Sequence, residues 1–169
     1  TTLFRSYNEA LTSLNDIMSK EPNHPVVNRL LMYTYDKLKN YDEVIATGKK
    51  FFSLPAGENI NYLVTDYTVL ADALMAKGQI DEAVKAYEKA VDIEPVQPTL
   101  SREIATKLAG ADRTADAAAF YQKYIDALPN EDASDYLQLG IYYYRTAGKF
   151  STKVAAAEKN QSGTTPNSG

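Results

Sequence analysis

Apolar residues recur along this chain at helical spacing, in blocks that themselves repeat. Between Val64 and Pro98, which lie 34 residues apart, apolar and small positions follow one another in a fixed order. That order is Tyr67, Leu70, Ala71, Leu74, Gly78, Ala83, Tyr87, Ala90 and Pro95. Spacings of three and four residues place side chains on one face of a helix. The pattern therefore predicts a helical hairpin as the repeating unit, with an apolar face that the neighbouring hairpin must cover.

The same frame fits the flanking sequence, with departures. A start at Pro98 places matching residues in register, whereas a start at Pro25 meets Met32 and Val44 at the small positions and Gly48 within a predicted helix. The first residues read as the second helix of an incomplete unit, so we expect the chain to have been excised from something longer. We predict one helical repeat domain, with a flexible tail or cloning remnant after it. Its parts are a half unit 1–24, units 25–63, 64–97 and 98–132, a partial unit 133–159 and the tail 160–169.

Prolines and glycines set the predicted helix ends. Proline suits the first turn of a helix, as at Pro25 and Pro98. Glycine suits the left-handed position that follows a helix, as at Gly78, Gly110 and Gly148. The predicted helices span residues 3–19, 25–39, 41–53, 62–77, 80–93, 98–109, 114–128 and 133–147, with a further one at 150–160. The sequence thus predicts an all-α protein.

Over residues 7–148 the chain resembles the tetratricopeptide repeat family. The family consensus places a large residue, Leu, Gly or Ala, and Tyr on the first helix, then Ala, an aromatic residue, Ala and Pro on and after the second. The resemblance implies an all-α, tetratricopeptide-type α-solenoid, in which antiparallel helix hairpins stack in a right-handed superhelix. It also implies a concave groove, lined by the first helix of each unit, that binds partners. Carried onto this sequence, the groove residues are Arg29, Tyr33, Lys37, Thr68, Asp72, Arg102, Thr106, Tyr144 and Arg145.

The function that this resemblance implies is a non-catalytic scaffold for a protein or peptide, as a segment of a bacterial or organellar assembly factor. Arginine and aromatic residues dominate interface energies, which favours Arg29, Tyr33, Arg102 and Tyr144 as anchors. Chaperone-binding members of the family hold a carboxylate with basic residues, and Glu103 in one of those slots would repel it. The alternative is a structural spacer or self-association module of a longer protein, whose functional domain lies outside this sequence.

Catalytic chemistry finds little support in the sequence. His24 is the single histidine, and the chain has no cysteine. We interpret His24 as a solvent-facing loop residue, because no orienting carboxylate or second ligand accompanies it. The pairs Asp42 with Glu43 and Asp81 with Glu82 stand at predicted helix starts, where carboxylates favour the exposed amide hydrogens. We therefore predict no catalytic, cofactor-binding or metal site, and no enzyme.

Charge and hydropathy narrow the partner class. The net charge of −4 and the pI near 5.1 disfavour binding to a phosphate backbone. No run approaches the roughly eighteen apolar residues that a membrane span requires. The sequence thus predicts a soluble chain that does not bind nucleic acid and does not insert into a membrane. The absence of cysteine fits a cytoplasmic protein as well as one of the bacterial cell envelope.

Overall fold

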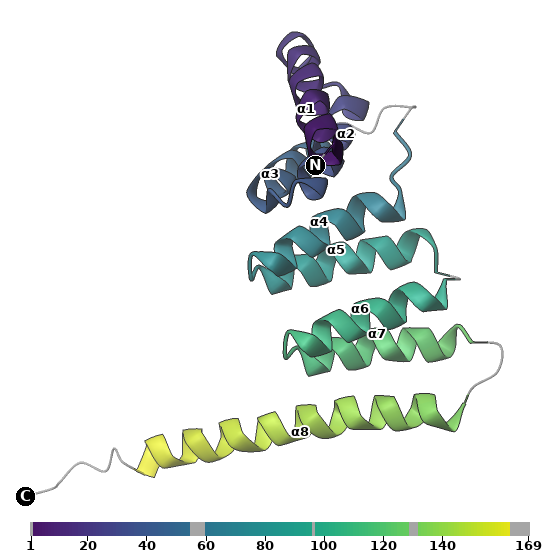
Figure 1. Cartoon of the computed structure of the whole chain (residues 1–169). Helices are drawn as coiled ribbons and strands as arrows, with labels where there is room; N and C mark the ends of the chain where they lie inside the picture. The colour runs from purple at the N-terminus through teal and green to yellow at the C-terminus, as the bar shows by residue number, and fades with distance from the viewer. Residues whose placement is uncertain (1, 55–59, 96, 129–131, 163–169) are drawn as a thin grey trace, which may run out of the picture. The chain divides into compact units, whose positions relative to one another are not determined.

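The structure is a computed structural model that describes residues 2–54, 60–95, 97–128 and 132–162. Within these ranges it contains α-helices and no strand, as Figure 1 shows. The helices are α1 (Thr2–Lys20), α2 (Pro25–Lys37), α3 (Tyr41–Ser53), α4 (Val64–Ala76), α5 (Ile80–Ile93), α6 (Pro98–Gly110), α7 (Thr114–Asp126) and α8 (Ala133–Ser162). The prediction of an all-α repeat fold is confirmed.

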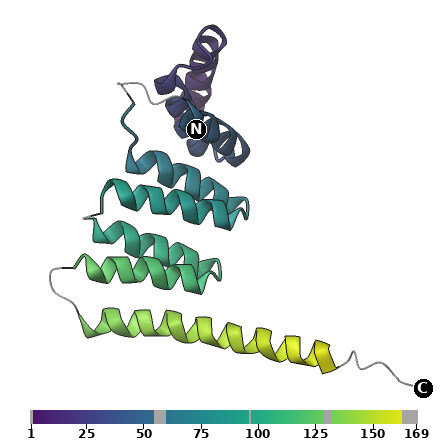
Figure 2. The same cartoon turned by 180° about the vertical axis from the view of Figure 1, so that it is seen from behind.

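Two compact units divide the chain after Glu94. The first unit holds α1 to α5, and the second holds α6 to α8. In the first unit α2 pairs with α3, and α4 pairs with α5, as antiparallel hairpins (Figures 1 and 2). In the second, α6 pairs with α7, and α8 lies along α7. The finer division into numbered repeat units stays a prediction.

Small residues bring the helices of two hairpins close together. Ala71 on α4 and Ala83 on α5 have no exposed surface, and neither do Ala105 on α6 and Ala117 on α7. Such small contacts let helix axes approach to about 8 Å. The full burial of both pairs is what a helix crossing at these residues requires.

Enlarging one of these alanines tests that placement. We expect Ala83→Leu to lower the free energy of unfolding by about 1–3 kcal/mol, because extra methylene groups in a filled core force neighbouring side chains away from their preferred rotamers. Urea unfolding followed by circular dichroism measures the change. An unchanged midpoint would contradict the crossing at this residue.

In the α2–α3 hairpin the large and the small residue of the helix contact are exchanged between the two helices. Met32 stands in the slot of Ala71, and Gly48 stands in the slot of Tyr87. A Cβ atom on Gly48 would lie 3.0 Å from Met32 Sδ and 3.1 Å from Leu70 Cδ1. The large side chain thus comes from α2 and the small residue from α3, the reverse of the α4–α5 hairpin.

Of the glycines predicted to follow helix ends, Gly78 does so and Gly110 does not. Gly78 is left-handed, with φ 73°, which confirms its role after α4. Gly110 is the last residue of α6, and the left-handed position falls instead at Asp112, with φ 62°. Predicted helix bounds elsewhere agree with the structure within two residues, and those of α3 and α5 agree at both ends.

Gly148 does not end a helix, so the prediction of separate helices at 133–147 and 150–160 was wrong. The single helix α8 continues through it to Ser162. A glycine within a helix costs only about 1 kcal/mol, and no proline stands nearby to stop the hydrogen-bond ladder. Residues 160–162, predicted to begin the tail, are helical, and residues 163–169 lie outside the described residues.

Candidate partner-binding groove

Arg29, predicted to line the groove, is committed to packing within the first unit. Its Nη2 atom lies 2.8 Å from Asp66 Oδ2 on α4 and donates to the carbonyl oxygen of Asn61 at 2.5 Å. Its guanidinium carbon lies 5.1 Å from the centre of the Phe51 ring. The Asp66 side chain has no exposed surface, and that of Arg29 is 20% exposed. Arg29 therefore fixes the start of α4 against α2.

The Asp66 carboxylate accepts two further hydrogen bonds. The Tyr33 hydroxyl donates to Oδ1, and the backbone N–H of Leu63 donates to Oδ2 at 2.8 Å. Burial, together with the hydrogen bond to the Asp66 carboxylate and its charge, raises the pKa of Tyr33 above its usual range. Tyr33 thus serves the same junction as Arg29.

The other predicted groove residues of the first unit also make local contacts. Lys37 is exposed and pairs with Asp36 at 3.2 Å. Thr68 is half-buried and donates to the carbonyl oxygen of Thr65 at 3.3 Å. Asp72 accepts a hydrogen bond from the Tyr87 hydroxyl. Lys37 is consequently the predicted residue that presents a charged group to solvent here.

The second unit has equivalent residues in a more open arrangement. Arg102 stands in the slot of Arg29, and its guanidinium carbon lies 5.7 Å from the centre of the Tyr124 ring. Asp135 stands in the slot of Asp66 and accepts the Tyr121 hydroxyl at 3.1 Å. Burial, with that hydrogen bond and the Asp135 charge, raises the pKa of Tyr121 to about 12. Arg102 is exposed and forms no ion pair within the described part of the chain.

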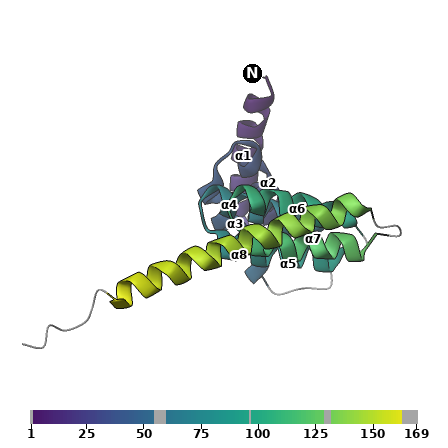
Figure 3. The ribbon, with the colours of Figure 1, turned by 90° about the horizontal axis from the view of Figure 1, so that it is seen from below.

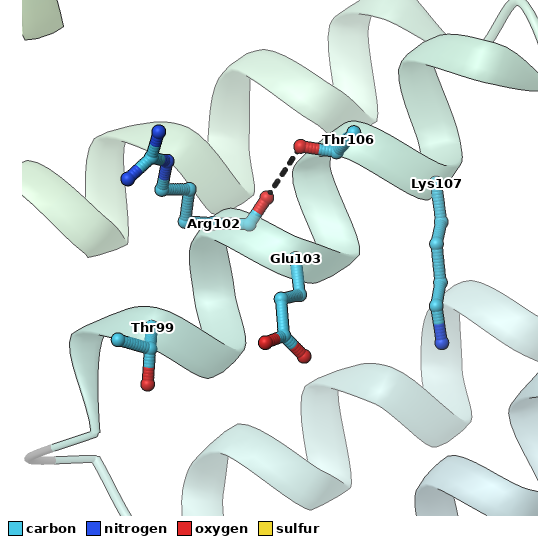
Figure 4. A pocket seen from close by; sticks show the side chains of 5 residues that line it. All are labelled: Thr99, Arg102, Glu103, Thr106 and Lys107. Carbon is cyan, nitrogen blue, oxygen red and sulfur yellow. Dashed lines mark hydrogen bonds between the residues drawn. The ribbon is translucent and has the colours of Figure 1, made fainter.

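Two cavities meet at Arg102. One, of about 430 Å³, lies among α6, α7 and α8, and the other, of about 460 Å³, lies along α6 (Figure 4). Arg102 and Thr106 line both, and the Thr106 hydroxyl donates to the carbonyl oxygen of Arg102 at 2.9 Å. We call the two cavities the α6–α8 groove. Its other lining residues are Thr99, Glu103, Lys107, Tyr121, Ser134, Asp135, Gln138 and Tyr142.

The structure thus brings two of the predicted groove residues together and adds several. Tyr144, 80% exposed, and Arg145 lie on α8 but do not line either cavity. The predicted groove residues do not include Gln138, although it lies about one helical turn after Ser134 on α8 and so shares its face. Tyr142 was also missed, and it carries no signal that separates it from a core tyrosine.

His24 has a structural role that the sequence interpretation did not assign. It is half-buried at the start of α2, where its Nδ1 atom accepts the N–H of Val27 at 3.4 Å. Its ring therefore caps the helix and is not a loop side chain facing solvent. The described residues contain no cluster of metal-ligating side chains, and none of the described helices is apolar over the length that a membrane span needs.

Comparison with known families decides the identity of the repeat. A family model described as "TPR repeat" matches residues 71–105. The chain contains a tetratricopeptide repeat. The matched residues run from Ala71 on α4, through α5, to Ala105 on α6. The predicted resemblance to the tetratricopeptide repeat family is confirmed in the segment that carried it most clearly.

Solved structures show the same tetratricopeptide-repeat fold. The C-terminal part of a TPR repeat-containing protein from Cytophaga hutchinsonii is 24% identical, with a TM-score of 0.64, over 86% of this chain. This chain spans 56% of the length of that structure. MamA is 18% identical, with a TM-score of 0.63, over 92% of this chain and 91% of its own. Naa15, in a complex with Naa10 and HypK-THB, is 20% identical, with a TM-score of 0.61, over 98% of this chain and 26% of its own.

These comparisons support a general class of function. No curated protein matches this chain. Tetratricopeptide-repeat proteins bind protein partners and are generally non-catalytic, so the class is that of a protein-interaction scaffold. At identities below 25%, the solved structures support the fold and not a particular partner.

Proposed function

We propose that this chain is a non-catalytic scaffold that binds a peptide segment of a partner protein in the α6–α8 groove. The observation that carries the proposal is that two adjoining cavities share an exposed arginine, Arg102. An arginine that is already ion-paired, such as Arg29 with Asp66 in the first unit, is less available to bind a partner. His24, the single histidine, caps helix α2, which is a structural role and not a catalytic one.

The lining of the groove suits an extended peptide. Thr106, Ser134 and Gln138 offer hydroxyl and amide groups at which peptide N–H and C=O groups find partners. Arg102 offers paired N–H donors for a carboxylate or carbonyl oxygen. Glu103 also lines the cavity along α6, but its side chain points to the other side of the helix from that of Arg102 (Figure 4). We therefore expect the preferred peptide to carry an acidic side chain for Arg102.

Related scaffolds agree with the proposed class of partner. The Naa15 structure is named as Naa15/Naa10 bound to HypK-THB. For this chain, the acidic net charge of −4 favours a polypeptide over a nucleic acid. The proposal therefore includes neither nucleic acid nor cofactor.

Peptide selection followed by affinity measurement tests the groove. Peptides are selected from a random displayed library, synthesised, and titrated against the chain by fluorescence anisotropy. We expect Arg102→Ala to weaken binding by about tenfold, the usual result of truncating an arginine anchor. The matched control is Lys123→Ala, which removes an exposed cation from α7 outside the groove.

The two variants separate the outcomes. Equal affinity of Arg102→Ala and the parent chain would exclude the α6–α8 groove as the binding site. A loss with Lys123→Ala as large as that with Arg102→Ala would indicate general attraction to positive charge. Circular dichroism of each variant establishes that helix content is unchanged.

A further inference from the structure

The cavity among α6, α7 and α8 is lined by one cationic and one anionic side chain. Arg102 from α6 and Asp135 from α8 both line it, and its other lining side chains are hydroxyl, phenol and amide groups. Figure 3 looks onto α8, which packs on α7 in the second unit. Because the two charges come from different helices and face one space, the cavity has a positive and a negative side while their formal charges cancel.

The Tyr121 hydroxyl lies within reach of both charges. Asp135 Oδ1 accepts this hydroxyl at 3.1 Å. Burial, with that hydrogen bond and the Asp135 charge, raises the pKa of Tyr121 to about 12, and the positive charge of Arg102 opposes the rise. Arg102 is therefore near enough to act electrostatically on the contact between Tyr121 and Asp135. No ion pair joins Arg102 to Asp135 among the residues that the structure describes.

The equivalent cluster in the first unit shows which groups satisfy such a pair. There Arg29 lies 2.8 Å from Asp66 and also donates to a backbone carbonyl oxygen at 2.5 Å. Both oxygens of Asp66 accept hydrogen bonds, one from the Tyr33 hydroxyl and the other from Arg29 and a backbone N–H. The arginine thus takes oxygen acceptors, and the aspartate takes donors on both oxygens. In the described part of the second unit, the Arg102 guanidinium and Asp135 Oδ2 have no such partners.

A ligand with charge of one sign fits this cavity poorly. A segment that is acidic throughout is attracted to Arg102, but Asp135 and the net charge of −4 repel it. A segment that is basic throughout is repelled by Arg102. A segment that carries one charge of each sign is attracted at both places, and its binding leaves neither charge of the cavity without a counter-charge.

We propose that the α6–α8 groove selects peptide segments in which an acidic and a basic side chain occur together, the acid bound by Arg102 and the base by Asp135. This inference rests on the proposed function and names the chemistry of the partner segment. Asp135 is then a specificity-determining residue, because it rejects wholly acidic segments that Arg102 alone would accept. A lysine or arginine of the partner supplies the donors that Asp135 Oδ2 lacks.

A cycle of protein and peptide variants tests the contact with Asp135. A displayed-library peptide that depends on Arg102 is synthesised with its basic residue kept or replaced by glutamine, and both forms are titrated by fluorescence anisotropy. The replacement should weaken binding to the parent chain by about fivefold, the upper range for a partly exposed ion pair. With Asp135→Asn, the same replacement should change the affinity by less than about twofold.

Asp126→Asn is the matched control for Asp135→Asn. Asp126 is exposed on α7, lines neither cavity, and accepts one hydrogen bond, from Gln122 at 2.8 Å. It should therefore leave the effect of the peptide replacement as in the parent chain. The asparagine at position 135 keeps an oxygen that accepts the Tyr121 hydroxyl, and circular dichroism establishes that helix content is unchanged.

Reversing the charge at position 135 tests the selection itself. Asp135→Lys sets a second cation in the cavity, so it should bind a form of the peptide with two acidic residues more tightly than the acid–base form by about fivefold. Asp126→Lys changes the net charge by the same amount outside both cavities. An equal gain with Asp126→Lys would show that overall charge, and not the cavity, sets the preference.

The outcomes separate this inference from the groove that it depends on. Equal losses on peptide replacement in the parent chain and in Asp135→Asn would overturn the role of Asp135 while leaving the α6–α8 groove in place. Tighter binding of the unreplaced peptide by Asp135→Asn would also overturn it, and would indicate that Asp135 competes with the ligand for Arg102. Binding that does not depend on Arg102 would overturn both the groove and this inference.

Discussion

Replacement of Asp66 by alanine is expected to lower the free energy of unfolding by about 3–5 kcal/mol, the usual result of breaking a buried ion pair from one side. The fully buried carboxylate accepts from the Arg29 guanidinium, the Tyr33 hydroxyl and the Leu63 N–H. Alanine leaves the guanidinium, 20% exposed, without its counter-charge. That remaining exposure places the expected loss toward the lower end of the range. Urea unfolding followed by circular dichroism measures it.

The second unit provides the matched control for this prediction. Asp135 occupies the equivalent slot, is half-exposed and accepts the Tyr121 hydroxyl at 3.1 Å. Asp135→Ala should therefore cost no more than about 1.5 kcal/mol, the net contribution of one ordinary hydrogen bond. Equal losses for the two variants would show that the Arg29 ion pair adds nothing to the α2–α4 junction.

The hairpins and their register are predictable from the sequence because each unit encodes them locally. The spacing of Ala71 and Ala83 marks the helix crossing, and proline at Pro98 marks the start of α6. The buried face of each helix follows from which positions repeat, without knowledge of what lies across the contact. For that reason the bounds of α3 and α5 agree with the structure at both ends.

Whether an arginine at a groove position pairs within the chain or faces a partner is harder to predict from the sequence. Arg29 and Arg102 occupy the same slot, and each has an aspartate at the same place in the following unit. The aspartate that neutralises Arg29 lies 37 residues further along the chain, so the pairing depends on how closely two helices approach. Arg, an aromatic residue and Asp recur at the same slots in both units, a recurrence that the sequence interpretation did not use.

The continuity of α8 shows a second limit. Gly148 has the same residue type as Gly78, yet one lies within a helix and the other ends one. A glycine permits a left-handed turn without requiring it, and the choice depends on whether a second helix folds back to bury its apolar face. The residue types around Gly148 do not decide between the two outcomes, and in the structure α8 is continuous through it.

A double-mutant cycle of Met32 and Gly48 in the α2–α3 hairpin should show the other large change in the free energy of unfolding. Met32 is fully buried, so Met32→Ala should lower the free energy of unfolding by about 2–5 kcal/mol through the cavity that it leaves. Gly48→Leu should cost about 1–3 kcal/mol, since its side chain would meet the Met32 sulfur and Leu70.

The double variant Met32→Ala with Gly48→Leu should be more stable than the sum of the two losses by at least about 1 kcal/mol, because the new side chain enters the space that methionine vacates. Urea unfolding of the four proteins gives this coupling. Leu108→Ala supplies the comparison, as it empties a fully buried site in the second unit and should combine with Gly48→Leu additively within about 0.5 kcal/mol. Additivity in both cycles would mean that Met32 and Gly48 do not share one volume. A coupling confined to the first cycle would establish that Met32 on α2 fills the space left by Gly48 on α3, the reverse of the arrangement in the α4–α5 hairpin.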